Sequence, residues 1–194
     1  MSSDQIALAS TIKAFHYENR LRGFAVYLLD RLVVEEISRC SGFDGEEDGP
    51  GEEGKKQVKV VCSITVDEDM TNNKNTLHGG CAAYLLDMCT SIAVLASQRG
   101  ASAPGTTTQP GPQIDELPAI DASTSQTIST TYQSPALLGD KLRITSRTLR
   151  VGRRSASVRC EIWNLTRRKL CVSGEQVKAL FEPQQCEGHE KAKL

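Results

Sequence analysis

The sequence predicts an α+β fold in which an antiparallel β-sheet wraps around one long central α-helix. Residues 77–96 form a helical segment with apolar side chains on every side, which is typical of a helix that is buried on all faces. Two strand-like segments precede this helix and four follow it, a succession that indicates a largely antiparallel sheet. At 194 residues the chain is long enough for one domain with a full core.

Before the central helix, the chain is predicted to form one short helix and one hairpin. Apolar residues recur at helical steps over residues 6–17. Residues 32–39 are rich in β-forming side chains, and residues 57–66 alternate an apolar set with a mostly polar one, which is typical of strands. Residues 41–56 are rich in Gly and Glu and cannot bury a core, so we expect a long surface loop between two paired strands.

The central helix itself is predicted to end at Arg99 and Gly100, because glycine adopts the left-handed conformation that closes many helices. Residues 101–122 are rich in Pro, Gly and Thr and are interpreted as a second long insertion. One apolar stripe of the helix consists of Ala82, Leu85, Leu86, Cys89, Ile92, Ala93 and Ala96.

Beyond the second insertion, residues 124–132, 141–150, 155–164 and 170–181 are predicted to be four strands of an antiparallel meander. These patterns divide the chain into three parts: an N-terminal helix within residues 1–22, one domain at residues 23–182 and a charged tail at residues 183–194. The domain carries insertions at residues 41–56 and 101–122.

The charge distribution restricts the classes of ligand. A net charge of −1 opposes a dedicated nucleic-acid-binding protein, which usually carries a strong basic excess. Lys and Arg nevertheless crowd the C-terminal third of the chain, where they suit a ligand that carries phosphate groups. The alternative is that they form solvated strand faces and edges.

The seven cysteines have neither C-x-x-C pairs nor metal-ligand spacing, so we expect no metal site and no disulfide framework. Free cysteines within apolar patterns fit a reducing compartment, and the N-terminus has no secretory pattern. We therefore expect an intracellular protein, either cytoplasmic or mitochondrial. His78, Asp87, Thr90 and Ser91 oppose a transmembrane helix over residues 77–96.

Asp87 is the one charged residue in the middle of the predicted buried helix. A buried carboxylate is costly unless it is hydrogen-bonded, paired or retained for chemistry. The start of the same helix, at Gly79 and Gly80, presents free backbone N–H groups and the positive end of the helix dipole, which suit a carbonyl oxygen that gathers negative charge. Asp87 is thus a candidate base, nucleophile or ligand of a hydrolytic water, with a purely structural hydrogen bond as the alternative.

The spacing of these two groups predicts an assembly. Gly79 and Asp87 are eight residues apart along one helix, which is about 12 Å and too far for both to act on one carbonyl. If both act, the helix start of one subunit must face the Asp87 of another. The sequence therefore predicts a two-fold dimer with two equivalent sites.

Two motifs carry a resemblance to a known family. The first is TNNKNTLHGG at residues 71–80, followed by Leu86 and Asp87. The second is Ser125 with TYQSPA at residues 131–136, followed by Gly139 and Asp140. Together they resemble small hotdog-fold acyl-CoA thioesterases of the thioesterase superfamily and phenylacetate-pathway type, over most of the chain from about residue 23 to 181.

The resemblance implies a role for each matching residue. The Gly79 N–H would polarise the thioester carbonyl, and Asp87 of the partner subunit would activate or replace the attacking water. Asn72 and His78 would orient the thioester and assist departure of the thiolate, while Ser125 would hold the water. The binding of the CoA moiety would fall to Gly80, Tyr132, Arg150, Gly152, Arg153 and Arg154. No cofactor or metal is implied, since CoA is part of the substrate, and hotdog dimers often pair again into tetramers.

Each of these residues also has a structural interpretation. His78 would then be an ordinary structural histidine, Asn72 would shape a turn, and Ser125 and Tyr132 would be ordinary strand residues. The activity has alternatives too: a non-catalytic acyl-CoA-binding protein, or a hotdog dehydratase or hydratase. The fold alone does not choose between them, and the length of the acyl chain is not encoded in any of these motifs.

Overall fold

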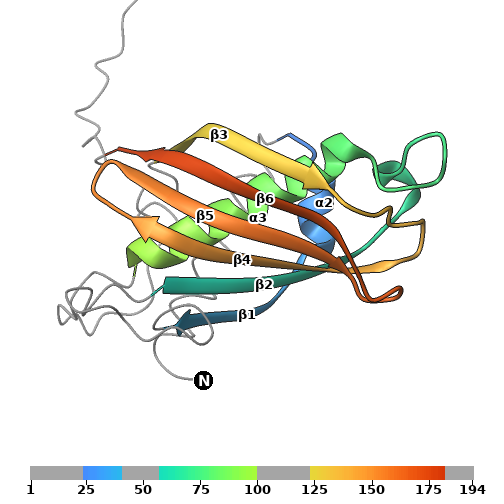
Figure 1. Ribbon diagram of the computed structural model, residues 1–194, viewed down its shortest axis with the longest axis horizontal. Helices are drawn as coiled ribbons and strands as arrows, with labels where there is room; N and C mark the ends of the chain where they lie inside the picture. Colours follow the sequence, from blue (N-terminus) through green and yellow to red (C-terminus); the bar gives the residue numbers. More distant parts are fainter. Residues whose placement is uncertain (1–23, 41–56, 100–122, 182–194) are drawn as a thin grey trace, which may run out of the picture.

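The computed structural model describes residues 24–40, 57–99 and 123–181. Their helices and strands are α2 (Val26–Arg31), β1 (Val33–Cys40), β2 (Gln57–Thr65), η1 (Glu68–Met70), α3 (Gly79–Arg99), β3 (Ser123–Tyr132), β4 (Lys141–Val151), β5 (Ser155–Asn164) and β6 (Lys169–Leu180). Figure 1 shows a single sheet with α3 lying along one of its faces, which confirms the predicted α+β fold. The sequence analysis did not predict α2 and the short η1.

Several predicted segments lie outside the described residues. These are the N-terminal helix within residues 1–22, the insertions at 41–56 and 101–122, and the tail at 183–194. The division of the chain at these boundaries stays a prediction.

The strand order is β1-β2-β4-β5-β6-β3, and every neighbouring pair is antiparallel. The predicted pairing of the two strands before the helix is confirmed by the β1–β2 register. The expected meander is correct for β4, β5 and β6 but wrong for β3, which pairs with β6 at the edge of the sheet.

The connection between β3 and β4 explains this difference. The connection at residues 133–140 is too long for a tight hairpin between β3 and β4. Its residues form backbone hydrogen bonds with the segment before α3 instead. The Leu77 N–H donates to the Ala136 carbonyl at 2.8 Å, and the Gly139 N–H donates to the Val66 carbonyl at 2.9 Å. The connection therefore crosses the end of the sheet, and β3 joins the opposite edge from β1.

The core lies between α3 and the inner face of the sheet. Alternate residues of β2, β4 and β5 point toward the helix, and Val60, Ile144 and Ile162 are completely buried. The whole predicted apolar stripe of α3, from Ala82 to Ala96, is buried as well. Residues 79–98 are long and apolar enough to span a membrane, but 67% of that window is buried inside the protein, as in the core helix of a folded domain.

The first two turns of α3 differ from the prediction of a helix buried on all faces. Gly80 is exposed, and Cys81, Ala83, Tyr84 and Asp87 are only partly buried. The apolar stripe faces the sheet, whereas the opposite side of these turns is covered only in part, where Tyr84 donates to the Phe24 carbonyl at 2.6 Å and packs edge-on against the Phe24 ring. Asp87 consequently lies at the border between the core and an open face.

Gly174 on β6 sets how closely α3 and β3 approach each other. A Cβ atom at this position would lie 2.3 Å from the Ser129 carbonyl oxygen of β3 and 2.6 Å from Leu86 Cδ1 of α3. Real Cβ atoms do not approach other atoms so closely, so only glycine fits here. This contact holds β3 and the middle of α3 side by side.

Candidate active site

Among the described residues, two backbone N–H groups at the start of α3, those of Gly79 and Cys81, have no acceptor. The His78 carbonyl accepts the first helical bond, from Ala82 at 3.0 Å, so His78 is the N-cap residue. Its ring nitrogen Nδ1 accepts the Gly80 N–H at 3.0 Å. The Gly79 N–H lies at the positive end of the helix dipole. It is therefore able to donate to an anionic oxygen.

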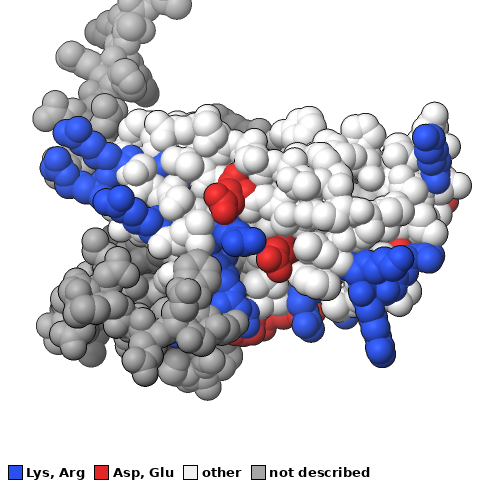
Figure 2. Space-filling view, viewed as in Figure 1, with Lys and Arg blue, Asp and Glu red and all other residues white. Residues whose placement is uncertain are grey.

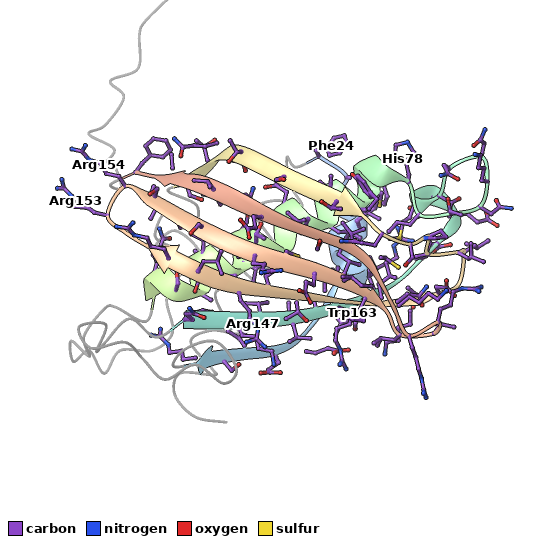
Figure 3. All side chains as sticks on the ribbon, in the orientation of Figure 1. Phe24, His78, Arg147, Arg153, Arg154 and Trp163 are labelled. Atoms are coloured by element: carbon purple, nitrogen blue, oxygen red, sulfur yellow. The ribbon has the colours of Figure 1, made fainter. Side chains whose placement is uncertain are left out.

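Asn72 lies in the loop that leads into this helix. Its Oδ1 accepts hydrogen bonds from the Lys74 N–H at 2.9 Å and from the Thr76 hydroxyl at 3.1 Å. These bonds shape the turn, as the structural interpretation of Asn72 expects. The His78 N–H in turn donates to the Met70 carbonyl at 2.8 Å, which attaches the loop to the core. His78 itself is exposed at the surface, as Figure 3 shows.

A pocket of about 350 Å³ opens beside the Gly79 backbone. Tyr132 forms one wall, and its hydroxyl donates to the Gly79 carbonyl at 2.9 Å. Most of the lining is apolar, and it comprises Leu77, Gly79, Ala82, Tyr132, Gln133, Ser134, Pro135, Ala136, Cys171 and Val172. The pocket thus combines an apolar surface with an available N–H donor, as sites for small organic groups do.

Asp87 lies in a second cluster, two turns further along α3. The Ser125 hydroxyl donates to Asp87 Oδ1 at 3.0 Å, so the structure brings these two predicted residues together. The same Oδ1 accepts a hydrogen bond from Gln176 Nε2, which also donates to Ser125 Oγ at 2.7 Å. Gln176 is a member of the cluster that the sequence analysis missed.

Two other side chains with titratable groups lie near these clusters. Burial, assisted by the charge of Asp87, raises the pKa of Tyr84 to about 12. Burial also raises the pKa of the Cys81 thiol to about 11, although a thiol in the first turn of a helix is often acidic. Both groups keep their protons at neutral pH, which leaves Cys81 a poor nucleophile and Asp87 the better candidate for chemistry.

Of the predicted CoA-binding arginines, Arg150 lies near the end of β4, and Arg153 and Arg154 lie in the turn between β4 and β5. The Gly152 N–H donates to the Ser155 carbonyl at 2.8 Å and closes this turn, so that Arg153 and Arg154 project into solvent. In Figure 3 they lie at the opposite end of the sheet from His78, and Figure 2 shows Lys and Arg side chains gathered there. The structure therefore does not bring this turn and the helix start together within one chain.

Neither a metal-binding cluster nor a second hollow among the described residues offers another candidate for the chemistry. Within the described residues, no group of three or more His, Cys, Asp or Glu side chains is arranged to hold a metal ion. A larger hollow of about 900 Å³ lies over the outer faces of β1, β2, β4 and β5, where charged side chains such as Lys59 and Glu36 line it. None of the predicted site residues contributes to that hollow.

Comparisons with known proteins agree with this fold. The model of the thioesterase superfamily matches residues 74–171, about half of the chain, a range that contains Gly79, Asp87 and Ser125. Mouse acyl-coenzyme A thioesterase 13 is 29% identical over 150 residues, which cover 77% of this chain and 93% of that protein. The human protein of the same name is 34% identical over 122 residues, which cover 63% of this chain and 73% of that protein.

A solved structure agrees as well. The zebra fish thioesterase superfamily member 2 superposes with a TM-score of 0.61 at 26% sequence identity, over 88% of this chain and 96% of that one. The central helix, the six-stranded sheet and the family match lead to one conclusion. The chain belongs to the thioesterase superfamily and has its hotdog fold.

Proposed function

We propose that this protein is an acyl-CoA thioesterase, which hydrolyses an acyl-CoA to a free acid and CoA. The observation that carries the proposal is the contact between Asp87 and Ser125, at the open side of a helix whose first N–H group is unoccupied. The names of the mouse and human relatives support acyl-CoA as the substrate. The protein would act inside the cell, in the cytoplasm or the mitochondrion.

In the proposed reaction, the Gly79 N–H donates to the thioester carbonyl oxygen and stabilises the negative charge that develops there. In one route, a water held by Ser125 attacks the carbonyl carbon while Asp87 accepts its proton, and the tetrahedral intermediate then breaks its C–S bond. In the other route, Asp87 attacks the carbonyl carbon, the C–S bond breaks to leave an acyl-Asp87 anhydride, and water then hydrolyses this anhydride. In both routes the thiolate leaves and takes up a proton. His78 and Asn72, at the helix start, would orient the thioester and assist this departure.

Two subunits are proposed to share each site. Gly79 and Asp87 are separated by eight residues of α3, a helical rise of about 12 Å, so one carbonyl contacts both groups only if a second chain supplies one of them. The edge strand β3 supports this assembly, since nearly all of its side chains are exposed and its outer edge has no partner among the described strands. A second copy paired at β3 would form a dimer, and dimers could pair again.

The phosphate groups of CoA would be held by the turn between β4 and β5. Arg153 and Arg154 in this turn and Arg150 near the end of β4 are exposed, and guanidinium groups bind phosphate through two parallel hydrogen bonds. Gly80 and Tyr132 would line the path of the thioester to the Gly79 N–H. No metal or redox cofactor has a step in this scheme.

Thiol release from a panel of acyl-CoAs of increasing chain length tests the proposal. We expect the wild-type protein to hydrolyse at least one of them, and Asp87→Asn to lower kcat by about 10²- to 10⁴-fold, as for loss of a general base. Glu175→Gln, on an exposed site of β6, is the matched control and should keep full activity. Binding without thiol release would identify a non-catalytic acyl-CoA-binding protein, and hydration of an enoyl-CoA would identify a hydratase; either result would refute the proposal.

A further inference from the structure

Gln176 is a completely buried polar side chain in contact with both members of the Asp87–Ser125 pair. It lies on the inner face of β6, and the register places its neighbour Lys178 opposite Ser125 on β3. The family match ends at residue 171, before this strand position. Gln176 itself takes no part in the bond changes of the proposed reaction.

The hydrogen-bond network fixes the orientation of its amide group. Asp87 is an acceptor when ionised, so the Gln176 atom that faces it must be the donor Nε2. Its oxygen Oε1 then faces the hydroxyl of Thr90, which is also completely buried and donates to it. The two protons of Nε2 are directed at Asp87 Oδ1 and Ser125 Oγ, so that all three polar groups are satisfied.

The two carboxylate oxygens of Asp87 differ in their hydrogen bonds. Oδ1 accepts from both Gln176 and Ser125, whereas no hydrogen bond from a described residue reaches Oδ2. A carboxylate held by one oxygen presents the other in a defined direction. A water or carbonyl carbon on the open side of α3 would therefore meet Oδ2.

We propose that Gln176 is a positioning residue, which clamps Asp87 Oδ1 and Ser125 so that Asp87 Oδ2 faces the substrate in its ionised form. This inference rests on the proposed function. Gln176 acts through Asp87 and need not contact the acyl-CoA. The amide itself carries no charge and does not titrate.

The titratable and charged side chains near Asp87 lie on α3 and β6. On α3 the titratable neighbour of Asp87 is Tyr84, which is uncharged at neutral pH. On β6 the buried Lys178 donates to Ser91, one turn further along the helix, and Glu175 is exposed. The inner side of β3 offers Ser125 but no acidic or basic residue. The hydrogen bonds to Asp87 Oδ1 thus come from two neutral donors, Gln176 and Ser125.

Three variants of the full-length protein test the inference. Gln176→Met keeps the volume and removes both donors, Gln176→Glu places a second carboxylate against Asp87, and Thr90→Val frees the amide to rotate. We expect Gln176→Met to lower kcat by about 10- to 100-fold, as for loss of a hydrogen bond to a charged group, with little change in KM. Gln57→Met, at the start of β2, is the control and should behave as wild type.

The dependence of kcat on pH separates positioning from a merely structural role. Loss of the donors disfavours the ionised carboxylate, so the acid limb of the profile should move to higher pH in Gln176→Met and further in Gln176→Glu. The acid limb of Thr90→Val should move in the same direction by a smaller amount. This variant still tests the inference if Gln176→Glu does not fold. Thermal melting checks that each variant is folded.

The outcomes for the two proposals differ. If Asp87→Asn keeps wild-type activity, the proposed function is wrong. If Asp87→Asn is inactive while Gln176→Met and Thr90→Val both keep the wild-type kcat and acid limb, only the positioning role of Gln176 is overturned. A folded Gln176→Met with a lower kcat but an unshifted acid limb also contradicts it, because that result describes a structural effect alone.

Discussion

The Ser125 hydroxyl donates to Asp87 Oδ1 at 3.0 Å and so connects the edge strand β3 to the middle of α3. The two residues are far apart in the sequence, and the long crossover between β3 and β4 is what allows β3 to reach this position beside β6. The candidate chemistry of the helix therefore depends on a strand at the outer edge of the sheet.

Removal of this hydroxyl should slow catalysis without loss of the fold. Ser125→Ala deletes one of two donors to Asp87 Oδ1 and the proposed ligand of the water, while Gln176 still holds the carboxylate. We expect kcat to fall about tenfold, less than for Asp87→Asn, with KM nearly unchanged. Ser157→Ala on β5 provides a control in steady-state assays, and an unaltered kcat in Ser125→Ala would exclude a role in the reaction.

Tyr132 should act through its hydroxyl at the start of α3. In Tyr132→Phe the Gly79 carbonyl loses the donor at 2.9 Å, but the ring still forms the wall of the pocket. Because one neutral hydrogen bond is at stake, we expect kcat/KM to fall about fivefold. Tyr132→Ala removes the wall as well and should raise KM more strongly. Equal kinetics of the two variants would show that the hydroxyl alone matters.

Asp140 should contribute to stability rather than to catalysis. Burial raises the pKa of this carboxyl, but donors from the Leu137 backbone, Asn164 and Arg167, all at 2.7 to 2.8 Å, outweigh it and lower the pKa below the ordinary 3.8. A lowered pKa in the folded state means that the contribution is complete above about pH 4 and is lost as the pH falls below it.

The test of this contribution is a comparison of unfolding at two pH values. Asp140→Ala leaves three buried or half-buried donors unpaired, so we expect a loss of about 2 to 4 kcal/mol in the free energy of unfolding at pH 7. The difference from wild type should shrink in denaturant titrations at pH 3. A difference that is independent of pH would show that the charge of Asp140 contributes nothing.

Gly174→Ala should separate β3 from α3. The added methyl group would lie 2.3 Å from the Ser129 carbonyl, so the strand must move to accept it. We expect the free energy of unfolding to fall by about 1 to 3 kcal/mol, as for an overpacked core. Because Ser125 moves with β3, we also expect kcat to fall even under conditions in which the variant is fully folded. Gly152→Ala, whose Cβ would meet its nearest neighbour at 3.4 Å, is the control for melting temperature.

Much of the fold follows from sequence patterns, because the residues that face the core are apolar. The alternation in β2, β4 and β5 and the apolar sides of α3 each have one stable arrangement, in which these faces meet. The place of β3 has no such signal. Its sequence, STSQTISTTY, is polar on both faces, and its pairing with β6 is set by the crossover at residues 133–140 rather than by its own side chains.

The candidate site was predictable only in part, for a related reason. Gly79 and Asp87 stand in a motif, and a charge in an apolar helix is conspicuous in any sequence. Gln176 lies in an ordinary strand pattern and lacks a motif. One signal did exist: Gln176 and Lys178 occupy inward positions that continue the row of Val172 and Gly174, where apolar side chains are expected. Polar residues on an inward face indicate a polar partner on the opposing helix.

The proposed sharing of each site between two subunits predicts how two inactive variants behave when they are mixed. Gly79→Pro removes the N–H group that is proposed to bind the carbonyl oxygen, and it adds a ring whose Cβ would lie 3.5 Å from the Tyr132 ring, an ordinary contact distance. Proline is favoured at the first position of a helix, where its fixed φ fits and its missing N–H breaks no helical bond. Gly79 does not have a positive φ, and the N-cap residue His78 already precedes the helix, so the fold should tolerate this substitution.

Gly79→Pro and Asp87→Asn should each be inactive alone, yet partly active after the two proteins are unfolded and refolded together. In a mixed dimer, the Gly79 of one chain meets the Asp87 of the other, so one site is intact and the second carries both changes. Random pairing makes half of the dimers mixed, so recovery should approach about a quarter of wild-type activity. If each site were built within one chain, no mixture would recover activity, because every chain would still lack one of the two groups.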